Sequence, residues 1–77
     1  MLELELGDES YIVCQAQFLL RAAFGFERSK ILPTNGKFDA VTEKAVKLFQ
    51  RRHKLVVTGK CDRTTWLALH KATGRRE

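Results

Sequence analysis

The sequence predicts a small all-α domain in which three helices are joined by extended loops. Two observations carry this prediction. Apolar residues recur at helical spacing from Ser10 to Phe26, and the pattern Gly-x-x-Asp-x-x-Thr occurs twice, at 36–42 and again 23 residues later at 59–65. A chain of 77 residues has room for one hydrophobic core. We therefore expect one domain over residues 1–77 with a loose tail at 73–77.

The first helix is expected over residues 9–24. Its apolar positions recur every three or four residues, as in an amphipathic helix: Ile12, Val13, Ala16, Leu19, Leu20 and Ala23. Asp8 is the expected N-cap, and Gly25 is the expected end because glycine accepts the left-handed conformation that closes helices. A loop with the single proline and an Asn-Gly pair follows, from Phe26 to Gly36.

The second and third helices are expected over residues 40–53 and 63–72, one after each copy of the repeat. Asp39 and Asp62 are the expected N-caps, each worth about 1 kcal/mol. Gly74 lies just beyond the third helix. The side chains expected to face the core are Val41, Ala45, Val46, Leu48, Phe49, Trp66 and Leu69, with Leu55 and Val57 packing under the helices.

The charge is unevenly distributed. The chain has 14 Lys and Arg against nine Asp and Glu, a net charge of +5. Four of the acids precede residue 10, which leaves five acids against all 14 bases in residues 10–77. An anionic partner such as nucleic acid, a cell-wall polymer or a membrane surface is therefore compatible with the charge, and so is a solvated surface that binds nothing.

The cysteines and histidines give no sign of catalysis or metal binding. Cys14 and Cys61 are expected to be buried free thiols, and neither forms a zinc-ligand spacing with His53 or His70. No arrangement that activates a nucleophile is visible. We expect a protein that is not an enzyme and needs no metal or cofactor.

A spread-out motif follows the loop. Its members are Gly36, Phe38, Asp39, Thr42, Ala45, Val46, Phe49, Gln50, Leu55, Gly59, Asp62, Thr65, Trp66 and Leu69. This pattern resembles the peptidoglycan-binding domain attached to bacterial and phage cell-wall hydrolases. The upstream segment with Val13, Ala16, Gln17 and Leu20 is similar to the first helix of that family, so the resemblance runs from Leu4 to Lys71. Ala16 stands where the family has Leu, and the loop at 27–35 is longer than usual.

The resemblance implies a non-catalytic binding module that attaches to peptidoglycan, through the glycan strand or the stem peptide, and tethers a catalytic domain or a partner hydrolase there. Such a module raises the effective concentration of the enzyme at its polymer. We expect a monomer with no nucleic-acid or membrane partner.

Candidate ligand contacts fall in two groups and one single residue. Asn35, Gly36 and Lys37, with Asp39 and Thr42, form a polar cluster at a helix start, although capping by itself accounts for Asp39 and Thr42. Phe26, which opens the long loop, is the expected apolar contact.

The second group lies on the second helix. Lys47, Gln50, Arg51 and Lys54 occupy positions i, i+3, i+4 and i+7 and are expected to share an exposed basic face. This face suits stem-peptide carboxylates or an anionic wall polymer, and a solvated face with a Glu43–Lys47 pair is equally compatible with the pattern.

Two alternative functions stay open. An intracellular protein-protein interaction module could use the same scaffold, because fold does not determine function. A basic nucleic-acid binder is suggested by charge alone and lacks an aromatic stacking platform. The sequence begins without a signal peptide, so we expect a cell-wall or extracellular location for an exported or phage lysis protein and a cytoplasmic one otherwise.

Overall fold

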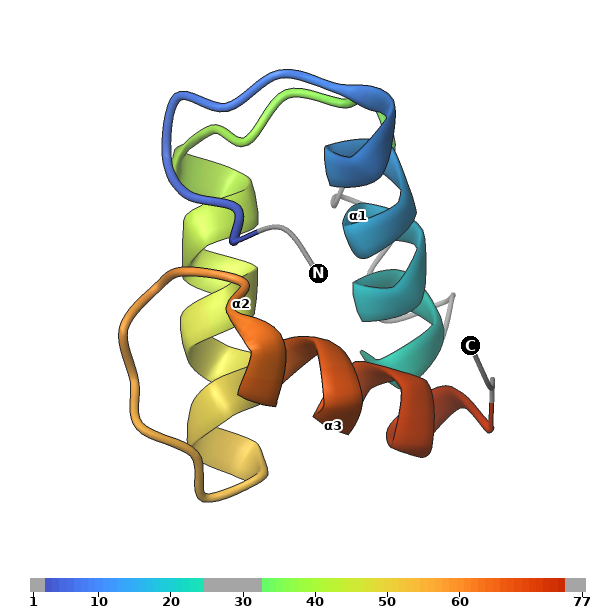
Figure 1. Ribbon diagram of the computed structural model, residues 1–77, viewed down its shortest axis with the longest axis vertical. Helices are drawn as coiled ribbons and strands as arrows, with labels where there is room; N and C mark the ends of the chain where they lie inside the picture. The colour runs from blue at the N-terminus through green and yellow to red at the C-terminus, as the bar shows by residue number, and fades with distance from the viewer. Residues whose placement is uncertain (1–2, 25–32, 75–77) are drawn as a thin grey trace.

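Three helices form the architecture of the computed structural model, which describes residues 3–24 and 33–74 (Figure 1). α1 spans Tyr11–Phe24, α2 spans Ala40–Arg52 and α3 spans Arg63–Thr73, each bound within two residues of its prediction. No strand occurs in the described ranges, so the all-α prediction is confirmed. In Figure 1, α1 and α2 stand on opposite sides of the molecule and α3 crosses at one end. None of these helices is long and apolar enough to cross a membrane.

The start of α1 differs from the prediction. Ser10, rather than Asp8, caps the helix, because its Oγ accepts a hydrogen bond from the Val13 N–H at 3.3 Å. The Asp8 carboxylate instead accepts from the Glu5 N–H at 2.9 Å and stabilises the turn before the helix. The predicted end at Gly25 lies outside the described residues, as does the part of the predicted tail at 75–77.

The starts of α2 and α3 confirm the predicted caps. Asp39 accepts from the Thr42 N–H at 3.1 Å and Asp62 accepts from the Thr65 N–H at 2.9 Å. α3 ends at Gly74, which adopts the left-handed conformation with φ of 73°.

A buried glutamine holds each copy of the repeated loop. The Gln17 amide donates to the Lys37 carbonyl and to Thr42 Oγ1, both at 2.9 Å, and its Oε1 accepts from the Gly36 N–H at 2.9 Å. This side chain has no solvent exposure, so the fold uses both ends of the amide to replace bonds to water.

The second copy repeats the arrangement around Gln50. Its amide donates to the Lys60 carbonyl and to Thr65 Oγ1, both at 2.9 Å, and its Oε1 accepts from the Gly59 N–H at 3.1 Å. The internal repeat of the sequence is therefore a repeated hydrogen-bond unit, in which a helix holds the glycine loop that leads into the next helix.

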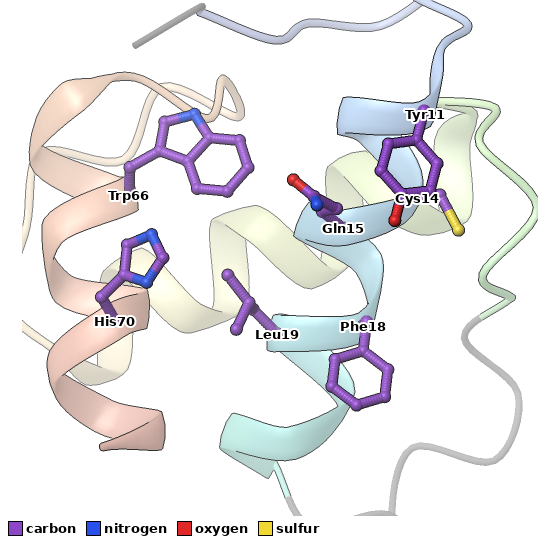
Figure 2. Close-up of a pocket in the computed structure, with 7 residues that line it drawn as sticks. All are labelled: Tyr11, Cys14, Gln15, Phe18, Leu19, Trp66 and His70. Carbon is purple, nitrogen blue, oxygen red and sulfur yellow. The ribbon is translucent and has the colours of Figure 1, made fainter. Parts of the chain in front are cut away.

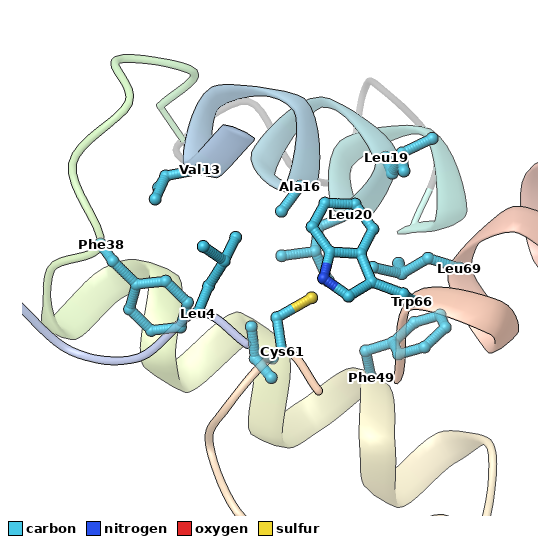
Figure 3. Packing of buried hydrophobic residues seen from close by; sticks show 11 residues of the cluster. Leu4, Val13, Ala16, Leu19, Leu20, Phe38, Phe49, Cys61, Trp66 and Leu69 are labelled. Carbon is cyan, nitrogen blue, oxygen red and sulfur yellow. The ribbon is translucent and has the colours of Figure 1, made fainter. Parts of the chain in front are cut away.

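The core lies between the three helices, and Figure 3 shows its side chains converging from all of them. Trp66, Leu69 and Cys61 are buried as predicted, at 6%, 0% and 0% exposure. The buried apolar residues are Leu4, Val13, Ala16, Leu19, Leu20, Phe38, Val46, Phe49, Cys61, Trp66 and Leu69. Ala45 and Leu55 pack against this core.

Three core predictions were wrong. Val41, Leu48 and Val57 are 45%, 47% and 43% exposed. The face of α2 that packs inward is the one with Thr42, Val46, Phe49 and Gln50, and Val41 and Leu48 lie on the opposite side. The error follows from assigning the buried face by hydrophobicity, whereas two polar residues of α2 are buried to hold the glycine loops.

The N-terminal segment closes the fold. Leu4 forms an isolated antiparallel bridge with Cys61, with hydrogen bonds of 3.1 and 2.7 Å in the two directions. A second bridge joins Glu9 to Lys37. The segment before α1 therefore binds to both repeated loops and places Leu4 in the core.

Candidate functional site

A pocket of about 460 Å³ opens between α1 and α3, and we call it the α1–α3 pocket (Figure 2). Its lining residues come from successive turns of the two helices: Tyr11, Cys14, Gln15, Phe18, Leu19, Trp66 and His70. A concave, largely apolar site with a few polar groups is typical of ligand pockets.

Aromatic rings dominate the α1–α3 pocket. Tyr11 and Phe18 are 75% and 40% exposed and lie seven residues apart, on one side of α1. From α3, Trp66 and His70 stack on each other with their ring centroids 6.0 Å apart. Trp66 is thus a core residue, as predicted, whose surface also lines the pocket. Apolar ring faces of this kind suit the C–H faces of sugar rings.

A second pocket of about 480 Å³, the loop pocket, adjoins the first. It shares Tyr11 and Cys14 with the α1–α3 pocket. Its other lining residues come from the segment before α1 and the loop before α2: Glu9, Ser10, Thr34, Asn35 and Gly36. The Cys14 thiol donates to the Thr34 carbonyl at 3.1 Å, which ties this loop to α1. The two pockets form one surface that is apolar at one end and polar at the other.

A family model described as "Putative peptidoglycan binding domain" matches residues 10–69 of the chain. The chain belongs to the peptidoglycan-binding domain family. The resemblance stated from the sequence is therefore confirmed, and membership indicates a peptidoglycan-binding function. No curated protein and no solved structure matches the chain.

Part of the predicted polar cluster of this peptidoglycan-binding domain lies at the loop pocket. Asn35 is exposed there, with its Oδ1 accepting from the Lys37 N–H at 3.0 Å. Gly36 lines the same pocket but is buried, and the Lys37 side chain is exposed. These three residues stay candidates for ligand contact.

Asp39 and Thr42 have structural partners. Asp39 caps α2, and Thr42 is fully buried and accepts from Gln17. The capping explanation that the sequence left open is thus observed for Asp39, while Thr42 holds the loop from inside.

The predicted basic face of α2 needs one correction. Gln50 is fully buried and bonded to the second glycine loop, so it does not lie on an exposed face with Lys47 and Arg51. Spacing of i, i+3 and i+4 shows that residues lie on one side of a helix, but it does not show which of them the core covers. Here the core covers Gln50 and leaves Lys47 and Arg51 exposed.

Lys47 and Arg51 are exposed, and Lys47 lies 3.8 Å from Glu43. The expected apolar contact Phe26 lies outside the described residues. Cys14, predicted to be buried, is half-buried and lines both pockets, while Cys61 is buried.

The α1 and α3 side chains of the α1–α3 pocket were not identified as a site from the sequence. Tyr11, Gln15 and Phe18 carry a helical spacing that marks one side of α1, and this was the available signal. What faces that side is α3, whose Trp66 is 55 residues from Tyr11 in the sequence. Within residues 3–24 and 33–74, no group of three or more His, Cys, Asp or Glu side chains could hold a metal ion.

Proposed function

We propose that this domain binds peptidoglycan along the joined α1–α3 and loop pockets and thereby tethers a catalytic domain or a partner hydrolase at the cell wall. Membership of the family supports peptidoglycan as the ligand. The position of the binding site is inferred from two exposed aromatic rings, Tyr11 and Phe18, which line the α1–α3 pocket.

The two rings suit a glycan strand. Seven residues of helix separate Tyr11 from Phe18 along α1, a rise of about 10 Å, which is comparable to the length of a disaccharide. Sugar C–H faces and N-acetyl methyl groups would pack on the rings, and the Gln15 amide can donate to or accept from hydroxyl groups.

The loop pocket suits the peptide that branches from the glycan. Ser10, Asn35 and the Glu9 carboxylate line it and offer donors and acceptors to backbone amides of the stem peptide. In this proposal glycan and peptide occupy adjacent pockets, as their covalent attachment requires.

The proposed mechanism is tethering. An open pocket on a domain this small gives weak binding, but a repeating polymer offers many equivalent sites, and an attached enzyme then acts at raised effective concentration. We place the working location at the cell wall for this reason.

Co-sedimentation with insoluble peptidoglycan stripped of other wall polymers, at about 50 and about 300 mM salt, tests the proposal. The variant Tyr11→Ala/Phe18→Ala should bind at least about tenfold more weakly, because it removes apolar ring contacts. The matched control Leu6→Ala/Leu67→Ala removes two side chains that are 53% and 48% exposed elsewhere and should stay within about twofold of the parent chain.

Binding that is equally weakened in both double variants would contradict the pocket assignment. If the parent chain does not sediment at either salt concentration, the peptidoglycan-binding proposal fails. The intracellular protein-interaction module would then be the function to test on the same scaffold.

A further inference from the structure

The exposed side of α2 is strongly basic. The helix contains the single acid Glu43 and four exposed cations, Lys44, Lys47, Arg51 and Arg52. A fifth exposed cation, Lys54, lies two residues beyond its end. Lys44, Leu48 and Arg51 follow one another at intervals of three or four residues opposite the buried residues of the helix. We call the exposed residues Val41, Lys44, Lys47, Leu48, Arg51 and Arg52 the basic face of α2.

The acids of the described chain lie away from this face or are already engaged. Glu3 and Glu5 approach Lys60 at 4.0 and 3.6 Å. Asp39 and Asp62 cap helices. Glu43 lies 3.8 Å from Lys47 and forms a surface ion pair with it. This pair does not neutralise the other cations of the helix.

The basic face of α2 is separate from the proposed peptidoglycan site. The joined pockets are lined by α1, α3 and the segments at 9–10 and 34–36. Figure 1 shows α2 on the side of the molecule opposite α1. A ligand of the pockets therefore leaves this face available.

We propose that the basic face of α2 binds a linear wall polymer with repeated phosphodiester charges, in addition to the peptidoglycan held by the pockets. The cations from Lys44 to Arg51 are spread over about 10 Å along the helix. Long, flexible side chains at this spacing can each meet one charge of an extended polyanion, and binding releases its counterions. The proposal rests on the proposed function because the wall presents both polymers together.

Two other anionic partners fit less well. Nucleic acid is favoured by exposed aromatic rings that stack on bases, but the exposed apolar residues of α2 are the aliphatic Val41 and Leu48, and Tyr11 and Phe18 lie on α1. A lipid surface is favoured by a large apolar contact, and two half-exposed aliphatic side chains supply little.

The test compares intact walls that carry phosphodiester polymer with the same walls after acid removal of that polymer. The test variant is Lys44→Gln/Arg51→Gln, and the control Arg63→Gln/Lys71→Gln removes the same charge from exposed positions of α3. On intact walls the α2 variant should bind about tenfold more weakly than the control. For this variant, the slope of the logarithm of the binding constant against the logarithm of salt concentration should be shallower by about 1.4, because two phosphate contacts are lost. On stripped walls the two variants should bind alike.

Each other outcome decides against the proposal. Equal losses in both variants on intact walls would show a general charge effect. An equal loss by the α2 variant on stripped walls would mean that this face meets peptidoglycan itself. If an oligonucleotide of equal charge displaces the chain from intact walls better than soluble polyol phosphate does, nucleic acid is the preferred partner. Sedimentation of the parent chain with stripped walls separately reports the proposed function.

Discussion

Gln17 and Gln50 show how single residues organise this domain. Each amide bonds to a glycine N–H and a lysine carbonyl of the loop that follows its helix, and to a threonine hydroxyl in the first turn of the next helix. A buried amide that lost these partners would cost several kcal/mol, a large share of the stability of a small domain. Both residues belong to the family pattern, and in this structure their bonds hold the loops from inside the fold.

Cys61 provides a prediction at the same scale. Burial, with the nearby Asp62 carboxylate, raises the pKa of the Cys61 thiol from 9.0 to about 12. In the variant Cys14→Ser the folded protein should therefore give no fast reaction with a thiol reagent at pH 8 and one equivalent after unfolding in guanidinium. Rapid reaction of the folded variant would contradict the buried position.

The same shift predicts a loss of stability at high pH. Because the pKa is higher in the folded chain, the stabilising effect is fully present below pH 9 and is lost as the pH rises toward about 12. The free energy of unfolding of the parent chain, measured relative to Cys61→Ala, should decline over this range. A constant difference between the two proteins would rule out the shift.

At the scale of elements, two equivalent loops differ in how tightly they pack. Gly36 and Gly59 both have left-handed φ values, 77° and 78°. A methyl group added at Gly36 would come within 2.9 Å of the Ser10 carbonyl oxygen, which is backbone. At Gly59 it would come within 2.8 Å of Lys47 Cε, which is part of a flexible side chain. An added methyl group therefore meets backbone in the first copy and flexible side chains in the second.

This difference predicts unequal costs of substitution. Gly59→Ala should destabilise by about 1 to 2 kcal/mol, the cost of the left-handed conformation. Gly36→Ala should cost more, about 3 kcal/mol or above, because the backbone at Ser10, just before α1, must also shift. Gly7→Ala is the matched control, since Gly7 has a φ of 99° with no atom within 4 Å of the added methyl group. Urea denaturation measures all three, and a Gly36 variant no less stable than the Gly7 variant would refute the close contact.

For the whole molecule, the segment before α1 is part of the fold although the family match begins at residue 10. Leu4 is 4% exposed and pairs with Cys61 through the backbone. Leu4 thus shares one core with Trp66 and Leu69 of α3. The N-terminal segment pairs with the loop that leads into α3.

Leu4→Ala should destabilise the domain by about 3 kcal/mol, because it removes most of a buried side chain. For a domain of this size the melting temperature should fall by about 10 °C or more. The control Leu6→Ala, at a position 53% exposed, should change stability by less than about 0.5 kcal/mol. Equal melting temperatures for the two variants would show that the segment does not contribute to the core.

The sequence by itself determined the three helices, the N-caps of α2 and α3, and the family, whereas the N-cap of α1 was Ser10 and not the expected Asp8. Asp39 and Asp62 cap helices through residues three positions away, and the left-handed Gly74 ends α3, so these signals are local and readable. Only the tertiary structure decided which side of α2 is buried and where the pockets lie. Gln17 meets Thr42 across 25 residues, and Tyr11 and Trp66 line one pocket across 55. Helical periodicity gives the direction of a side chain around its own axis, but the element that faces it is set by packing of the whole chain.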